Sequence, residues 1–154
     1  MDRTCTSAST PPLQYDIVVC GGGPSGICAA IAAAEAGRRT LLVEASGRLG
    51  GTAVNAMVNQ IRRWMETPYV VRFVDRLPRT LDDSEFLDLY YADRVREAGA
   101  EILLHATVAE TVLDPQPESG RPTVIGVRLA TTGGPLTVGA ERVIDASGDG
   151  TVAF

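Results

Sequence analysis

The chain has 154 residues, a net charge of −5, 45% hydrophobic residues and 21% charged residues, which is the composition of a globular protein. This length favours a single domain that buries about two thirds of the surface exposed by its unfolded chain. The negative charge argues against a general attraction to nucleic-acid backbones. No run approaches the roughly 18 apolar residues that span a bilayer, so we expect neither a nucleic-acid nor a membrane partner.

The first segment, 1–14, is rich in Ser, Thr and Pro and lacks the apolar run of a signal peptide. We expect it to be a disordered tail that precedes one domain over 15–154. The cysteines at 5, 20 and 28 form no C-x-x-C pair, so the sequence predicts neither a metal site nor a redox-active disulfide. An odd cysteine count fits a reducing compartment, and we expect a cytoplasmic protein.

The segment 15–44 has the order strand, glycine turn, helix and strand that is typical of a nucleotide-binding βαβ unit. The expected elements are an apolar strand over 15–20, a helix that starts near Pro24, continues through 27–36 and ends at Gly37, and a second strand over 40–43. Because the first strand is apolar almost without interruption, we expect it to be buried on both faces of a parallel sheet.

A G-x-G-x-x-G pattern lies in the turn, at Gly21, Gly23 and Gly26. These glycines allow a tight turn, the close approach of a pyrophosphate, and close packing of the helix on the strand. Pro24 and Ser25 complete the first helical turn, where free N–H groups and the helix dipole favour a negative charge. The pattern predicts a dinucleotide site, and the alternative is a tight turn in a domain that has lost its ligand.

Glu44 stands at the carboxyl end of the second expected strand, about 20 residues after the glycines. An acid at this place accepts hydrogen bonds from a ribose diol. It favours a free 2′-hydroxyl over a 2′-phosphate.

Two segments at opposite ends of the chain carry a family resemblance. The sequence DIVVCGGGPSGICAAIAAAEAGRRTLLVEASGRLGGTA, which starts at Asp16, and the sequence RVIDASGDGTVAF, which starts at Arg142, resemble the FAD-dependent oxidoreductases with a glutathione-reductase-like fold. The likeness covers 15–154, is loose over 54–80, and is limited to the amino-terminal portion of such proteins. The chain therefore looks truncated relative to that family.

The resemblance implies FAD as the cofactor and adds contact residues to the glycine turn. These are Gly50, Gly51 and Thr52 beside the pyrophosphate, Val108 beside the adenine, and Ala146, Ser147, Gly148 and Asp149 in a turn that returns to the nucleotide. Asn55, Asn59 and Gln60 face the flavin ring or its substrate, or else belong to a surface loop. The catalytic residues are unknown, and the sole histidine, His105, is expected near the adenine rather than in catalysis.

The rest of the chain predicts the remaining layers of the fold. A helix over 81–99 opens on a capping box at Asp82 and Glu85 and carries an apolar stripe that we expect to pack on the sheet. The stripe consists of Phe86, Leu87, Leu89, Tyr90, Tyr91 and Val95. A strand over 100–104 and a three-stranded β-meander over 106–112, 123–130 and 135–139 follow. The run 69–74 is either a strand or a helix. We expect an α/β Rossmann-like fold with a parallel sheet, helices on one face and the β-meander on the other.

Three function classes remain open on these grounds. The chain is an FAD-binding oxidoreductase or part of one, with an unidentified small-molecule substrate and NAD(P)H or a protein as electron donor. Alternatively, it is a flavin-binding subunit without turnover of its own, or a domain that serves only in assembly. Because related chains continue past the 145–150 turn, we expect this one to act as an oligomer or with a second chain.

Overall fold

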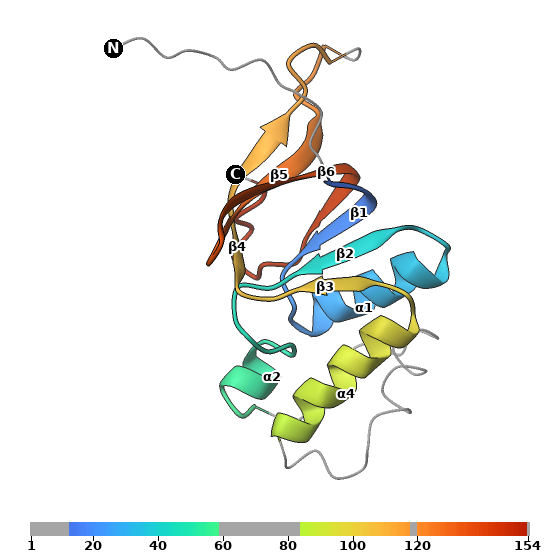
Figure 1. The fold of residues 1–154 in the computed structure, drawn as a ribbon, viewed down its shortest axis with the longest axis vertical. Coiled ribbons are helices and arrows are strands. Elements are labelled where there is room, and N and C mark those ends of the chain that lie inside the picture. The colour runs from blue at the N-terminus through green and yellow to red at the C-terminus, as the bar shows by residue number, and fades with distance from the viewer. Residues whose placement is uncertain (1–12, 59–83, 118–119, 154) are drawn as a thin grey trace.

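The structure of the chain is a computed structural model that describes residues 13–58, 84–117 and 120–153. The strands are β1 (Leu13–Cys20), β2 (Thr40–Val43), β3 (Glu101–Leu103), β4 (Ala106–Leu113), β5 (Val124–Thr131) and β6 (Gly134–Asp145), and the helices are α1 (Pro24–Glu35), α2 (Thr52–Asn55) and α4 (Ser84–Glu97). Six strands form one sheet in the order β3-β2-β1-β6-β5-β4 (Figure 1). The expectations for the tail before residue 13, for Asn59, Gln60 and Asp82, and for the run 69–74 lie outside the described residues.

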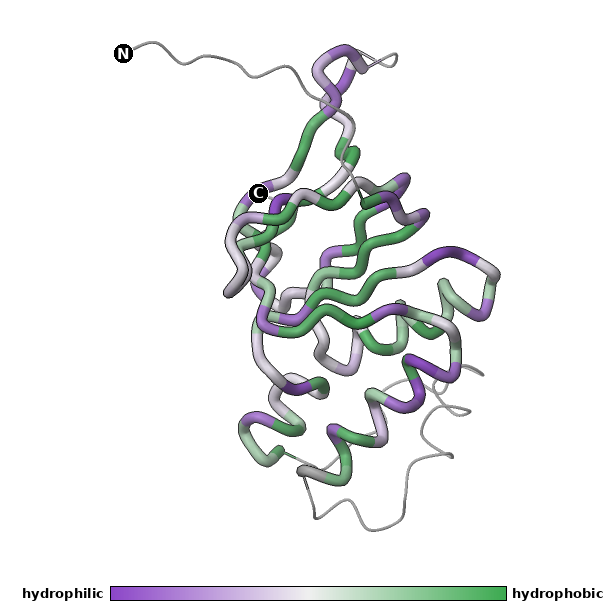
Figure 2. The backbone as a smooth tube through the Cα atoms, viewed as in Figure 1, coloured by the Kyte–Doolittle hydropathy of each residue, from purple (hydrophilic) through white to green (hydrophobic). Residues whose placement is uncertain are grey.

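β1 is the centre of the parallel half of the sheet. It pairs in parallel with β2 on one side and with β6 on the other, so that Val18 lies between Leu41 and Val143. The strand begins at Leu13 rather than at Tyr15, because Leu13 pairs with Val138 of β6. In Figure 2 the middle of β1 and of β2 is hydrophobic, as the uninterrupted apolar run predicted for a strand that is covered on both faces.

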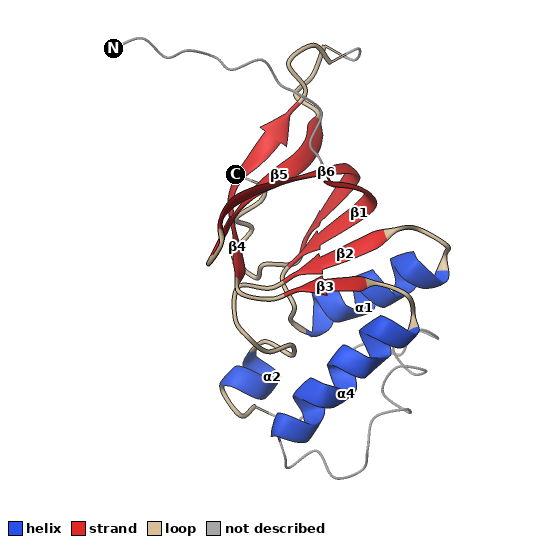
Figure 3. Ribbon diagram, viewed as in Figure 1, coloured by secondary structure: helices blue, strands red, loops and turns tan. Residues whose placement is uncertain are grey.

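Two hydrophobic clusters lie on opposite faces of this sheet. One joins the inward faces of α1 and α4 to Val19 and Leu42. The other joins Val18 and Leu41 to Val127 and other residues of β5, β6 and the start of β4. The helices α1 and α4 therefore cover one face of the parallel strands, and the meander strands β4, β5 and the first half of β6 cover the other face (Figure 3). This arrangement confirms the expected α/β Rossmann-like fold.

β6 differs from the sequence prediction. The meander strand expected at 135–139 continues without a break to the turn that begins at Asp145, so that β6 is one strand, Gly134–Asp145. Its first half pairs with β5 in antiparallel fashion, and its second half pairs with β1 in parallel. Gly139 stands inside the strand, paired with Gln14 of β1 and with Gly126 of β5. The glycine therefore does not end the strand.

Helix α4 presents a narrower apolar stripe than the sequence suggested. Leu87, Tyr91 and Val95 are fully buried at helical spacing, whereas Phe86 and Leu89 are 47% and 64% exposed. The expectation that the whole stripe packs on the sheet was therefore wrong for these two residues, because they point away from the face that meets α1 and β3. None of the helices in the described part of the chain is long and apolar enough to cross a membrane.

Candidate functional site

A cavity of about 270 Å³ opens at the carboxyl end of the parallel strands. This edge is where open α/β sheets bind their ligands. It is lined by Cys20 and Gly21 after β1, residues 43–45 after β2, residues 106–108 of β4, and Ser147, Asp149 and Thr151 after β6. Five residues predicted from the sequence line it together: Gly21, Glu44, Val108, Ser147 and Asp149.

The turn between β1 and α1 is packed too tightly for side chains at two of its glycines. Gly21 has a φ of +114°, and a Cβ there would lie 2.3 Å from the carbonyl oxygen of Ala146. A Cβ on Gly26 would lie 1.8 Å from the carbonyl oxygen of Gly21. The backbone N–H of Ala146 donates to the Cys20 carbonyl at 2.8 Å, which joins the turn after β6 to the end of β1. The helix, the strand and the carboxyl-terminal turn therefore meet at van der Waals contact.

Gly23 lies in a different environment at the start of α1. It is the N-cap, in an extended conformation with φ −72° and ψ 175°, and apart from its chain neighbours no atom of the described residues lies within 4 Å of the place where its Cβ would be. Within the described residues, no side chain caps the helix, and its first turn, from Pro24 through Ser25, carries no acid. An uncapped, unobstructed helix start of this kind suits an anionic group.

Glu44 lies at the cavity wall with both carboxylate oxygens fixed by backbone donors. The N–H of Gly22 donates to Oε2 at 2.6 Å, and the N–H of Ser46 donates to Oε1 at 2.7 Å. A carboxylate has about four lone-pair sites, so each oxygen can still accept from a ligand hydroxyl. The two backbone hydrogen bonds thereby orient the Glu44 side chain before any ligand binds.

The turn at Gly50, Gly51 and Thr52 lies beside the start of α1. The Gly50 N–H donates to the Gly22 carbonyl at 2.7 Å. Gly51, with a φ of +55°, approaches so closely that a Cβ would lie 3.1 Å from the Cα of Gly23. Thr52, which is exposed, begins α2. The structure therefore brings the two glycine-rich turns together, although 24 residues lie between Gly26 and Gly51.

Asp145 organises the carboxyl-terminal turn, and the sequence reasoning missed it in favour of Asp149. Its Oδ1 accepts from the N–H and Oγ of Ser147 at 3.0 and 2.7 Å, and its Oδ2 accepts from the N–H groups of Val152 and Ala153 at 2.9 and 3.1 Å. Burial by itself raises the pKa of Asp145, but these hydrogen bonds outweigh it and leave the pKa below its ordinary value. The signal in the sequence is an Asp two residues before a Ser, as in an Asx-turn.

Gly148 and Asp149 lie at the tip of the same turn. Gly148 has a φ of +88°, and in the part of the chain that the structure describes only its chain neighbours come within 4 Å of the place where its Cβ would be. Asp149 is exposed at the mouth of the cavity.

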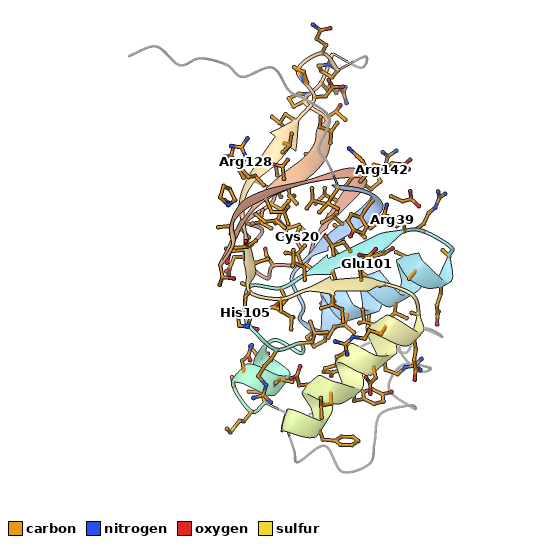
Figure 4. All side chains as sticks on the ribbon, viewed as in Figure 1. Cys20, Arg39, Glu101, His105, Arg128 and Arg142 are labelled. Carbon is orange, nitrogen blue, oxygen red and sulfur yellow. The ribbon has the colours of Figure 1, made fainter. Side chains whose placement is uncertain are left out.

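The cysteines and the histidine contribute packing to this region. Cys20 is 1% exposed, and burial together with the charge of Asp145 raises the pKa of its thiol to about 12. Burial raises the pKa of Cys28 to about 11, so both thiols stay protonated. His105 is outside the cavity lining, with its ring against Gly47, where a Cβ would lie 2.6 Å from His105 Cε1 (Figure 4). No three His, Cys, Asp or Glu side chains of the described ranges are grouped to hold a metal.

The sequence profile of a family described as FAD dependent oxidoreductase matches residues 16–154. The chain belongs to this family of flavoproteins, and its cofactor is FAD. Thiamine thiazole synthase of Aeropyrum pernix is 33% identical over 91% of this chain and 57% of its own length. Dihydrolipoyl dehydrogenase of Trypanosoma brucei brucei is 51% identical over 55 residues, which are 36% of this chain and 11% of that protein.

Solved structures share the fold. THI4 of Thermovibrio ammonificans superposes with a TM-score of 0.73 at 24% identity, over 91% of this chain and 60% of that one. A 3-ketosteroid dehydrogenase of Rhodococcus jostii superposes with a TM-score of 0.70 at 17% identity, over 93% and 47% of the two chains. The chain thus spans a little over half the length of the thiamine thiazole synthase that it matches along most of its own length.

Proposed function

We propose that this chain is the FAD-binding part of an oxidoreductase and that it holds FAD at the carboxyl edge of the parallel sheet. The observation that carries the proposal is the open, uncapped start of α1 at Gly23, which follows two residues after Gly21, and Gly21 lines the same cavity as Glu44. The cofactor pyrophosphate would lie on the first turn of α1, where N–H groups and the helix dipole favour anions.

The adenosine would occupy the cavity. Its volume of about 270 Å³ is below the 300 to 1,000 Å³ range of pockets for drug-sized ligands, so it suits one moiety of a dinucleotide. Glu44 would accept hydrogen bonds from the ribose diol, and Val108 would border the adenine. The residues proposed to contact FAD are Gly21, Gly23, Pro24, Ser25, Gly26, Glu44, Gly50, Gly51, Thr52, Val108, Ala146, Ser147, Gly148 and Asp149.

The cofactor and the chain would contribute different parts of the chemistry. FAD, when bound, supplies hydride or electron transfer through its ring. The chain contributes binding and orientation: the tight contacts of Gly21 and Gly26 fix the helix start, and Asp145 fixes the turn that borders the cavity. We assign no acid or base to a residue of this chain.

The partners form part of the same proposal. We infer a small-molecule substrate, an electron donor that is NAD(P)H or a protein, a cytoplasmic location, and action as an oligomer or with a second chain. The similarity to a dihydrolipoyl dehydrogenase over 55 residues supports a redox role. Cys20 and Cys28 form no disulfide within the described residues, and thiols in this state fit a reducing compartment.

A second candidate function is supported by a different observation. The likeness to a thiamine thiazole synthase extends over 91% of this chain, whereas the likeness to the dehydrogenase covers 36% of it. A synthase role, or a flavin-binding subunit without turnover, would use the same nucleotide site. The oxidoreductase differs from these other candidates in that its bound flavin would be reduced by an electron donor.

The test is to titrate the purified apoprotein with FAD and then add NADH or NADPH without oxygen. We expect a stoichiometric oxidised-flavin absorbance band that bleaches with one of the donors. A band that persists with both donors would favour the synthase or subunit role. Binding of NAD with no binding of FAD in a parallel calorimetric titration would overturn the proposal.

A further inference from the structure

We propose that Asp88 of α4 is a positioning residue that holds the turn 48–51 against the start of α1 and so sets the affinity for the cofactor's phosphates. This inference rests on the proposed function, because it assigns the phosphates to the first turn of α1.

Asp88 connects two segments that are distant in the sequence. Its Oδ1 accepts from the Leu49 N–H at 2.8 Å, and its Oδ2 accepts from Arg48 Nε at 3.4 Å. The Asp88 and Arg48 side chains are 23% and 37% exposed, and Leu49 is 1% exposed. A hydrogen bond to a charged acceptor is stronger than a neutral one, and it costs most to lose when the donor cannot turn to water. The Leu49 N–H therefore depends on Asp88.

A second contact from the same helix holds the next residue of the turn. Tyr91, one helical turn after Asp88, is fully buried. A Cβ on Gly50 would lie 3.1 Å from the Tyr91 ring and 2.3 Å from Val54 Cγ2. α4 thus fixes Leu49 through a carboxylate and confines Gly50 through an aromatic ring.

The turn transmits this constraint to the phosphate side of the site. The Gly50 N–H donates to the Gly22 carbonyl at 2.7 Å, and Gly51 packs against the Cα of Gly23. The adenosine side is fixed by other bonds, since Glu44 accepts from Gly22 and Ser46. If the Leu49 bond is lost, the Gly50–Gly51 pair shifts relative to the open face of Gly23, while the Ser46 bond to Glu44 stays. The loss should therefore weaken the binding of phosphates and spare adenosine.

The experiment compares ADP with adenosine as competitors of FAD on Asp88→Ala, Asp88→Asn and Asp93→Ala. Asp93 is a matched control, because it lies on the same helix, 72% exposed, in an ion pair with Arg96. We expect Asp88→Ala to weaken ADP about tenfold, the equivalent of one hydrogen bond to a charged group, and to leave adenosine within about twofold. Asp88→Asn keeps an oxygen that accepts from Leu49 and should recover most of the ADP affinity. Asp93→Ala should match the wild type.

Two results would overturn the inference. One is unchanged ADP affinity in Asp88→Ala, and the other is an equal loss for ADP and adenosine, which would indicate general loosening of the fold. If Asp88→Ala does not fold, Asp88→Glu replaces it, because glutamate moves the carboxylate by one methylene. A ratio of ADP affinity to adenosine affinity that is the same in Asp88→Glu as in the wild type would also overturn the inference. A wild type that binds neither FAD nor ADP would instead contradict the proposed function.

Discussion

At the scale of single residues, Gly26 and Gly23 perform opposite tasks within one turn. Gly26 faces the backbone of Gly21, so that an added Cβ would lie 1.8 Å from a carbonyl oxygen, whereas Gly23 faces open space. Gly26 is therefore required by the fold itself, whereas packing within the described residues does not require a glycine at position 23.

We predict that Gly26→Ala lowers the free energy of unfolding by about 1 to 3 kcal/mol, the usual cost of overpacking, because the clash involves backbone that cannot rotate away. Urea denaturation of the apoprotein measures this. Gly133→Ala is the matched control, since its nearest neighbour would be Thr131 Oγ1 at 3.7 Å. Equal stability of the two variants would contradict the close packing of α1 on β1.

The hydrogen bonds of Asp145 predict a pH dependence. Since the pKa of Asp145 is lower in the folded chain than its ordinary value of 3.8, its contribution to stability is complete above that value and is lost as the pH falls through the folded pKa. Asp145→Asn should cost about 1 to 2 kcal/mol at pH 7, because partly exposed donors lose a charged acceptor. The difference from the wild type should shrink below about pH 4. Denaturation curves at pH 7 and pH 3 test this, and a difference that grows toward low pH would refute it.

At the scale of elements, the orientation of α4 decides which of its apolar residues stabilise the domain. We predict that Leu87→Ala lowers the free energy of unfolding by about 2 to 5 kcal/mol, because Leu87 is fully buried between α4 and α1. Leu89→Ala, at a residue that is 64% exposed, should change it by no more than about 0.5 kcal/mol. Chemical denaturation of both variants is the measurement. A larger cost at Leu89 would place the other face of α4 against the core.

The elements also show where sequence reasoning succeeds. Local signals predicted β1, the glycine turn, α1 and β2, because alternating or uninterrupted apolar patterns and fixed turn residues act over a few positions. The predicted strand 135–139 ended too early, because Gly139 was read as a turn residue while the long-range pairing of β6 with β1 and β5 was not visible. Tertiary packing overrode the local preference there.

At the scale of the whole molecule, local signals predicted residues of the candidate site, whereas contacts between distant segments were not predicted. The sequence pointed to Gly21, Glu44 and Ser147, which line one cavity although they come from three different strand ends. The hydrogen bonds of Asp88 to Leu49 and of Asp145 to Val152 were not predicted. Each depends on how distant or irregular segments meet in space. The cavity-lining residues were therefore more accessible to sequence reasoning than the residues that hold them in place.

The central claim is that FAD binds with its phosphates on the open start of α1, and Gly23→Thr tests it most directly. Threonine is a favourable N-cap and accepts the extended backbone of this position, so the apoprotein should stay as stable as the wild type. Its side chain would fill the space that the pyrophosphate needs. In a calorimetric titration we predict stoichiometric FAD binding by the wild type and no measurable binding by Gly23→Thr. Equal FAD affinity of the two proteins, with both folded, would contradict the account.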